Sequence, residues 1–339
     1  MAVKIAINGF GRIGRLFFRQ MWGKKGMEVV AVNDLGNVEN LAYLLEYDSV
    51  YGKFGEGVKT KGTALVVGGK EIVVFQEKNP AKLPWKQLGV DIALEATGVF
   101  ESFEEARAHL KAGAKKVVLT APASDEDGAT EKTVLMGINE QEFASIMISS
   151  NASCTTNAAS PVIAILEENP GIEKAILNTV HGYTATQNLV DGPTRGKDFR
   201  RGRAAAQNMV PSSTGAAIAV TRAVPALRGK FDGIAIRVPA ITGSIADITF
   251  LAKRKTSVEE INGILEDASR LPRWEGILKV TRDPIVSSDI VREPYGAIVD
   301  LNFTRVIDGD LVKILSWYDN EWGYVATLVK HVEAAARTL

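Results

Sequence analysis

The one cysteine of this 339-residue chain lies in a polar stretch, Ser150-Asn151-Ala152-Ser153-Cys154-Thr155-Thr156-Asn157. An apolar run over 146–149 predicts a strand before it, and 158–166 predicts a helix after it, with Pro161 as a place for a kink. Cys154 is therefore expected near a helix N-terminus, where free N–H groups and the helix dipole favour an anion. Such a site can lower a thiol pKa from about 8.5 to roughly 3.5–7.5, which makes the sulfur a nucleophile. The alternative is a small buried hydrophobic side chain, but the neighbouring hydroxyl and amide groups favour the nucleophile.

A nucleophilic thiol needs a base, and the chain has three histidines. His109 falls within a predicted surface helix and His331 within a predicted C-terminal helix. His181 ends a predicted strand over 176–180 and precedes Gly182-Tyr183-Thr184. By elimination, His181 is the best candidate to pair with Cys154 as its base, the alternative being a structural imidazole.

The N-terminus carries a second chemical motif. A β-rich run over 3–7 is followed by Asn8-Gly9-Phe10-Gly11-Arg12-Ile13-Gly14, a helical pattern to Met21, and a strand over 28–33 that ends at Asp34. In a dinucleotide-binding unit, Gly9 and Gly11 would allow close approach of a pyrophosphate and Asp34 would bind the adenosine ribose. A 2′-phosphate beside Asp34 would be repelled by up to about 4 kcal/mol, so NAD is favoured over NADP. The alternative is a glycine-rich structural turn.

Further strand and helix patterns position these residues. Strands are predicted over 91–96, 116–120, 134–138 and 146–149, with a helix from Ser102 to Gly113. The run over 64–75 is typical of a hairpin and is interpreted as an insertion. In an open parallel sheet, ligands bind beyond the carboxyl ends of the strands. The residues expected at that edge are Gly9, Asp34, Thr97, Thr120 and Cys154.

The pattern changes after Cys154. Alternating or β-rich runs over 175–180, 233–238, 244–251, 297–305 and 311–317 surround one clear helix, 257–269, which predicts an antiparallel sheet. The expected fold is α/β: a Rossmann dinucleotide-binding domain over 1–153 and an α+β catalytic domain with a mostly antiparallel sheet over 154–319. A final helix over 320–339 is expected to return to the first domain.

Three features after Cys154 are candidates for anion binding. Arg237 ends a predicted strand, and Pro211-Ser212-Ser213-Thr214-Gly215-Ala216-Ala217 offers hydroxyl and amide donors. These features also fit a solvated strand end and a helix N-cap. The third is a basic loop, which is more typical of a solvated or interface segment than of a phosphate site: Arg195, Lys197, Arg200, Arg201 and Arg203.

Composition excludes several classes of function. The chain has 40 Lys and Arg against 40 Asp and Glu, so no net charge attracts nucleic acid or an anionic membrane. One cysteine and three histidines do not make the usual structural zinc sites, and no metal is expected. No apolar run reaches the length of a membrane span, and a strand is predicted directly at the N-terminus without a signal peptide. We expect a cytoplasmic protein.

The assembled motifs resemble phosphorylating glyceraldehyde-3-phosphate dehydrogenase along essentially the whole chain. The matching stretches are 8–15, 150–157, 181–184, 211–217, 237–239 and Trp317-Tyr318-Asp319-Asn320-Glu321-Trp322-Gly323-Tyr324. The resemblance implies a homotetramer that oxidises glyceraldehyde 3-phosphate with NAD and couples this to inorganic phosphate. It also implies that Cys154 is the nucleophile and that His181 activates it.

Further roles come from the resemblance alone. It implies NAD contacts at Arg12, Ile13, Asp34, Lys78, Thr120 and Asn320, and substrate or phosphate contacts at Ser153, Thr155, Thr184, Thr214, Gly215 and Arg237. Arg201, in the basic loop, is a further candidate anion anchor. Which of Thr184, Arg237 and Thr214 serves each of two phosphate pockets stays open. Ala158 stands where many members carry a second cysteine, and the basic loop has one extra residue relative to some members.

Two competing hypotheses remain. An erythrose-4-phosphate dehydrogenase would share nearly every motif. A catalytically idle NAD-binding or RNA-binding module is the alternative from a different class, and Cys154, His181 and the balanced charge argue against it.

Overall fold

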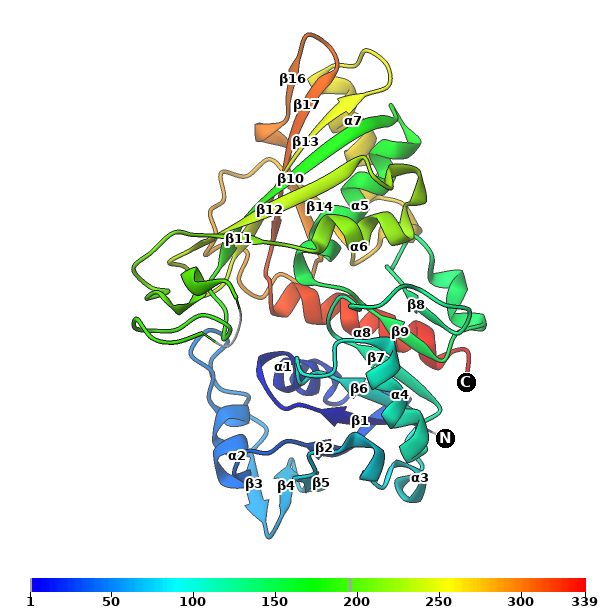
Figure 1. Cartoon of the computed structure of the whole chain (residues 1–339), viewed down its shortest axis with the longest axis vertical. Helices are drawn as coiled ribbons and strands as arrows, with labels where there is room; N and C mark the ends of the chain where they lie inside the picture. Colours follow the sequence, from blue (N-terminus) through cyan, green and yellow to red (C-terminus); the bar gives the residue numbers. More distant parts are fainter. Residues whose placement is uncertain (1, 195–196) are drawn as a thin grey trace. The chain divides into compact units, whose positions relative to one another are not determined.

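The computed structural model describes residues 2–194 and 197–339, so Arg195 of the basic loop lies outside the described residues. The chain divides into two compact units (Figure 1). The first comprises Met1–Ala152 with Leu328–Leu339, and the second comprises Ser153–Thr327.

The first unit is built on a sheet whose described strands follow the order β3-β4-β5-β2-β1-β6-β7-β9-β8. From β5 to β8 every neighbouring pair is parallel. Apolar residues of β1, such as Ile5 and Ile7, are fully buried, as expected for a parallel sheet covered on both faces. The strands are β1 Val3–Asn8, β2 Met27–Asn33, β3 Lys59–Lys61, β4 Ala64–Val67, β5 Lys70–Phe75, β6 Ile92–Glu95, β7 Lys116–Leu119, β8 Glu131–Thr133 and β9 Ile148–Ser150.

Two sequence expectations for this sheet are wrong. β5 is not part of an insertion, because it pairs in parallel with β2 and belongs to the main sheet. Residues 134–138 are not a strand, and β8 precedes them. The physical reason is local: Asn139 accepts a hydrogen bond from the Leu135 backbone, and Gly137 has a φ of 79°, so the chain turns there despite its apolar residues.

The helices associated with the first unit begin and end largely as their capping residues dictate. α4 starts with a capping box between Ser102 and Glu105 and stops at Gly113, whose φ is 107°. The final helix was expected over 320–339 and is observed from Trp322, with its last residues in the first unit. The helices are α1 Arg12–Met21, α2 Val38–Glu46, α3 Trp85–Leu88, α4 Phe103–Ala112 and α8 Trp322–Ala336.

The second unit contains a sheet of order β11-β12-β10-β13-β17-β15-β14, with β16 paired to β17. Most pairs are antiparallel, as expected, but β10 pairs with β12 and β14 with β15 in parallel. The sequence did not predict β11 or β14. The strands are β10 Ile172–Gly182, β11 Val210–Ser213, β12 Phe231–Val238, β13 Ser244–Ala252, β14 Leu278–Thr281, β15 Ala297–Asp300, β16 Arg305–Ile307 and β17 Leu311–Tyr318.

The helices of the second unit are α5 Cys154–Glu168, α6 Ala216–Ala223 and α7 Val258–Ser269, of which α6 was indicated only by the helix N-cap alternative for 211–217. Side chains along β13 alternate between buried and half-buried, which is typical of a sheet with one covered face. Because β10 and β12 are parallel, no hairpin can join them, and the chain over 183–230 crosses from the end of one to the start of the other.

Candidate active site

Cys154 is the first residue of α5. Ser153 caps the helix: its Oγ accepts a hydrogen bond from the Thr156 backbone N–H, and the Thr156 hydroxyl accepts one from the Ser153 backbone N–H. Ala152, directly before the cap, has a φ of 53°, which is unusual for a residue with a side chain. This tight turn brings the thiol to the first turn of the helix, as the sequence predicted.

The structure brings together Cys154 and His181. The Cys154 Sγ lies 3.3 Å from His181 Nε2. On the other side of the ring, Nδ1 lies 2.6 Å from the Gly182 carbonyl oxygen, to which an Nδ1–H can donate. In the tautomer that makes this hydrogen bond, the Nε2 lone pair faces the sulfur, which is the orientation that a base needs.

Strand register explains why Arg237 joins this pair. His181 on β10 and Arg237 on β12 are direct partners in the parallel ladder. The Arg237 Nη1 lies 2.8 Å from His181 Nδ1 and 3.3 Å from the Gly182 oxygen, to which it donates. Arg237 is therefore not a solvated strand end but a cation next to the imidazole.

Burial and the Arg237 charge set the electrostatics. Burial raises the pKa of Cys154, which is opposite to the direction expected from the sequence, while Arg237 and hydrogen bonds to Thr155 act to lower it. Burial and then the charge of Arg237 lower the pKa of His181 to about 3. Together these effects favour a neutral thiol beside a neutral imidazole, with a short path for the proton from sulfur to Nε2.

Tyr318 supports the pair, although the sequence assigned it no role. Its hydroxyl lies 2.8 Å from Thr155 Oγ1 and 2.7 Å from Thr179 Oγ1, and the Thr179 hydroxyl donates to the Ile245 carbonyl. The Tyr318 ring meets the His181 ring edge to face at 5.8 Å. Tyr318 thus connects the first turn of α5 to the strand that carries His181. Its signal in the sequence was its place at the end of a β-rich run.

Hydroxyl and guanidinium groups gather on the segment after β10. Thr184 Oγ1 lies 2.9 Å from Thr186 Oγ1, which accepts a hydrogen bond from Arg201. Arg201 also donates to Ser212 Oγ at 2.9 Å. This cluster links Thr184 with one residue of the basic loop, and Thr186 was not predicted. Arg200 and Arg203 form ion pairs with Asp198 and Asp191, and Arg201 itself lies 3.9 Å from Asp198.

Thr214 and Gly215 stand at the start of α6. Gly215 is the N-cap, and the Thr214 hydroxyl accepts a hydrogen bond from the Ala216 backbone. The segment therefore does cap a helix, which was one of its two interpretations. This does not exclude the other, because a helix N-terminus also attracts anions.

The orientation of the Asn320 side chain is fixed. Its Oδ1 accepts hydrogen bonds from Ser244 Oγ at 2.9 Å and Thr242 Oγ1 at 3.3 Å. The Ser244 hydroxyl in turn accepts one from the Gly182 backbone. Since hydroxyl groups occupy the oxygen, the Asn320 amide presents its N–H₂ as the donor to a ligand.

The first unit holds a cleft of about 450 Å³ at the carboxyl ends of its strands. Gly9 has a φ of 94°, and a Cβ on Gly14 would lie 2.1 Å from the Gly9 carbonyl, so the turn and the packing of α1 require these glycines. A Cβ on Gly11 would meet nothing within 4 Å, and α1 begins with neither a side-chain cap nor an acidic residue. The open helix N-terminus fits a pyrophosphate. The cleft is lined by Asn8, Gly9, Gly11, Asn33, Asp34, Leu35, Glu77, Lys78, Ala96, Thr97, Val99 and Phe100.

The other residues expected to bind the cofactor do not all line the cleft. Asp34 is held by backbone N–H groups of Phe10 at 2.7 Å and Gly36 at 2.8 Å. Arg12 forms an ion pair with Asp48, whose pKa is lowered by that contact against the effect of burial. Neither Arg12, Ile13 nor Thr120 lines the cleft.

Neither a metal site nor a membrane span is evident in the part of the chain that the structure describes. Over residues 2–194 and 197–339, no three His, Cys, Asp or Glu side chains are grouped to hold a metal ion. No helix within these ranges is both long and apolar enough to cross a bilayer.

The parallel sheet, the glycine turn and the cleft define the first unit as a dinucleotide-binding domain of the Rossmann class. Family models agree: residues 3–103 match the "Glyceraldehyde 3-phosphate dehydrogenase, NAD binding domain" and residues 153–320 match its "C-terminal domain". The chain belongs to the glyceraldehyde-3-phosphate dehydrogenase family.

Curated relatives match over nearly the full length of the chain. The glyceraldehyde-3-phosphate dehydrogenase of Zymomonas mobilis is 46% identical over 342 residues, covering 100% of both chains. That of Clostridium pasteurianum is 46% identical over 98% of both chains, and that of Mycobacterium avium is 47% identical over 100% of both.

Proposed function

We propose that this chain is a cytoplasmic, NAD-dependent enzyme of glycolysis and gluconeogenesis that converts glyceraldehyde 3-phosphate and inorganic phosphate to 1,3-bisphosphoglycerate. The observation that carries the proposal is the 3.3 Å contact between Cys154 Sγ and His181 Nε2 in a member of this family. Nearly half of the residues are identical to those of relatives named for this activity.

The proposed reaction forms a covalent bond to Cys154. The sulfur attacks the aldehyde carbon, and the thiol proton passes to His181 Nε2 and from there to the carbonyl oxygen, which becomes the hydroxyl of a hemithioacetal and leaves His181 neutral again. His181 then takes up the hydroxyl proton as the carbon is oxidised to a thioester. Bound NAD supplies the hydride acceptor. An oxygen of inorganic phosphate finally attacks the thioester, the carbon–sulfur bond breaks, and Cys154 is regenerated.

Developing negative charge needs stabilisation at two places. The Cys154 backbone N–H, at the first turn of α5, is a proposed donor to the oxyanion on the substrate carbon. Arg237 is the cation beside His181 and is proposed to attract phosphate. Ser153, Thr155, Thr184, Thr214 and Gly215 complete the proposed substrate and phosphate contacts.

The residues of the first unit fit NAD. Gly9 and Gly11 are proposed to admit the pyrophosphate to the N-terminus of α1, and Asp34 is proposed to bind the ribose hydroxyls. Its carboxylate is already oriented by two backbone N–H groups. The remaining proposed contacts are Arg12, Ile13, Lys78, Thr97, Thr120 and Asn320.

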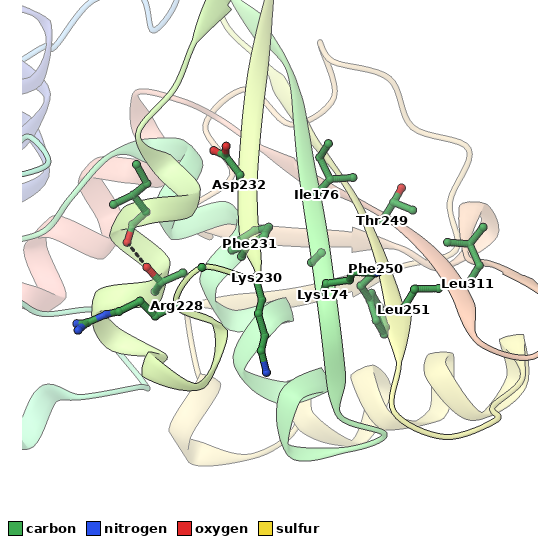
Figure 2. A pocket seen from close by; sticks show the side chains of 14 residues that line it. Lys174, Ile176, Arg228, Lys230, Phe231, Asp232, Thr249, Phe250, Leu251 and Leu311 are labelled. Atoms are coloured by element: carbon green, nitrogen blue, oxygen red, sulfur yellow. Dashed lines mark hydrogen bonds between the residues drawn. The ribbon is translucent and has the colours of Figure 1, made fainter.

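The proposal extends to domains and assembly. It assigns NAD binding to 1–153, catalysis to 154–319 and a returning C-terminal helix to 320–339. It also includes a homotetramer, supported by a groove of about 720 Å³ on the second unit's sheet (Figure 2). Ile176 on this face and Ile218 on α6 are each more than half exposed, which is unusual for apolar side chains that line one groove. We propose that further copies of the chain cover this face.

The test is NADH production from glyceraldehyde 3-phosphate with and without inorganic phosphate. We expect a steady rate that requires phosphate, and we expect Cys154→Ser to abolish it while leaving NAD affinity within about twofold, since the hydroxyl is a far weaker nucleophile. A substantial steady rate in Cys154→Ser would remove the covalent mechanism. A higher kcat/KM for erythrose 4-phosphate would instead identify the competing substrate.

A further inference from the structure

Three polar side chains form a buried row across the first unit's sheet. Asn33, Asn8 and Glu95 are the last residues of the neighbouring strands β2, β1 and β6, and the parallel register sets them directly opposite one another. Each is at most 4% exposed. Such a buried row requires internal hydrogen-bond partners.

The hydrogen bonds along the row run in one direction. Asn33 Nδ2 donates to Asn8 Oδ1 at 2.7 Å, and Asn8 Nδ2 donates to Glu95 Oε2 at 2.6 Å. At its outer end, the Asn33 amide exchanges hydrogen bonds of 2.9 Å with the backbone N–H and carbonyl of Glu77. This pattern fixes the orientation of both amides.

Glu95 is the common acceptor of the row. Besides Asn8, its carboxylate receives hydrogen bonds from the Thr97 backbone N–H at 2.9 Å and from the Thr97 hydroxyl. The Thr97 hydroxyl in turn accepts the Val99 N–H at 3.1 Å. Glu95 therefore holds the turn that follows β6.

His109 is a further donor to Glu95. The Trp85 indole, which can only donate, lies 3.0 Å from His109 Nδ1, so that nitrogen must be the acceptor. The ring proton is then on Nε2, which lies 3.0 Å from Glu95 Oε2 and donates to it. His109 is fully buried and belongs to α4, so it ties that helix to the row.

The row forms one wall of the 450 Å³ cleft. Asn8, Asn33, Glu77, Thr97 and Val99 all line the cleft and all belong to the hydrogen-bond chain that ends on Glu95. Glu95 and His109 do not line it. They can therefore influence a ligand in the cleft only through these neighbours.

We propose that Glu95 and His109 form a positioning pair that sets the geometry of the NAD cleft. The carboxylate accepts hydrogen bonds from four groups, and it keeps Asn8 and the Thr97 turn in the conformation that binds the cofactor. This inference rests on the proposed function, because it takes the cleft as the NAD site.

The first test is Glu95→Gln, measured by calorimetric titration with NAD. A glutamine NH₂ group must face at least one of the four donors, so the row loosens and we expect the Kd for NAD to rise about tenfold. The 15N resonance of His109 provides an independent measurement. In the wild type we expect the ring proton on Nε2, because Nδ1 accepts from Trp85, and in Glu95→Gln we expect the resonances of both ring nitrogens to shift.

A second pair of variants covers the case in which Glu95→Gln does not fold. His109→Gln keeps a donor for Glu95 and His109→Leu removes it. We expect the Kd for NAD to stay within about threefold of wild type in the glutamine variant and to rise about tenfold in the leucine variant.

The matched control is His331→Gln, since His331 is an equally buried imidazole of the first unit that bonds to Ser149, away from the cleft. We expect it to alter stability and leave the Kd unchanged. Folded Glu95→Gln or His109→Leu protein with wild-type NAD affinity would overturn the inference. Failure of the wild type to bind NAD would instead overturn the proposed function.

Discussion

Cys154, His181 and Arg237 come from one helix and two strands of the same unit. Each alters what the others can do: the arginine charge lowers the pKa of both the thiol and the imidazole, and the imidazole offers a lone pair to the thiol proton. The reactivity of the sulfur therefore depends on neighbours that are far away in the sequence.

His181→Asn removes the base without changing the strand. Because Nε2, 3.3 Å from the sulfur, can take up the thiol proton and form an imidazolium beside the thiolate, we expect the alkylation of Cys154 by iodoacetamide to shift to higher pH and to slow several-fold at pH 7 when this base is removed. The chain has one cysteine, so the alkylation rate reports on this thiol alone. An unchanged pH profile would show that His181 does not act on Cys154.

At this scale the sequence predicted Cys154 and His181 from residue type, position and elimination. It did not predict that Arg237 would contact the imidazole, because that contact follows from the parallel register of β10 and β12. It also expected a lowered thiol pKa from the helix N-terminus, whereas desolvation, which depends on packing, outweighs that effect here.

Elements position these residues through close backbone contacts. The turn between β1 and α1 depends on two glycines for different reasons: Gly14 lets the helix approach the turn, while Gly11 borders open space. The G-x-G-x-x-G pattern alone does not distinguish the two roles, which become apparent only from the packing around each glycine.

Gly14→Ala and Gly11→Ala should therefore differ. A Cβ at position 14 would lie 2.1 Å from the Gly9 carbonyl oxygen. We therefore expect Gly14→Ala to lower the free energy of unfolding, measured by urea titration, by about 1–3 kcal/mol or more. A Cβ at position 11 meets no protein atom, so we expect near-normal stability but at least tenfold weaker NAD binding. Wild-type NAD affinity in Gly11→Ala would exclude the pyrophosphate from this turn.

Helix α8 gives an element-scale prediction for pH. Burial lowers the pKa of His331 to about 3, so between pH 6.5 and 3 the unfolded chain binds a proton there that the folded chain does not. The free energy of unfolding must then rise with pH over this range. Each pH unit of acidification should lower it by up to about 1.4 kcal/mol through this residue. We expect His331→Gln to reduce the slope of unfolding free energy against pH, measured by urea titration from pH 7 to 5. An equal slope in both proteins would contradict this origin.

Most helices and strands could be predicted from the sequence, because hydrophobic periodicity, helix caps and glycine turns are local signals. The exceptions have non-local causes. β5 looked like half of a free hairpin until its pairing with β2 was known, and α6 and β11 were hidden in a segment without clear periodicity.

At the scale of the whole molecule, the exposed sheet face predicts self-association. Ile176→Glu places a charge in the groove of Figure 2, and we expect it to shift the protein from tetramers toward smaller species in analytical ultracentrifugation. Leu271→Glu is the matched control, since Leu271 is similarly exposed but does not line the groove. A tetramer of unchanged stability in Ile176→Glu would exclude this face as an interface.

The parallel pairing of β10 and β12 has an evolutionary consequence. Its obligatory connection, over 183–230, contains Thr184, Arg201, Thr214 and Gly215, while the two strands themselves hold His181 and Arg237. Under the proposed function, several of the phosphate and substrate contacts thus lie on the connection, while the base lies on β10. Substitutions or length changes in the connection can retune which phosphorylated aldehyde is accepted, and the machinery around the sulfur can remain untouched.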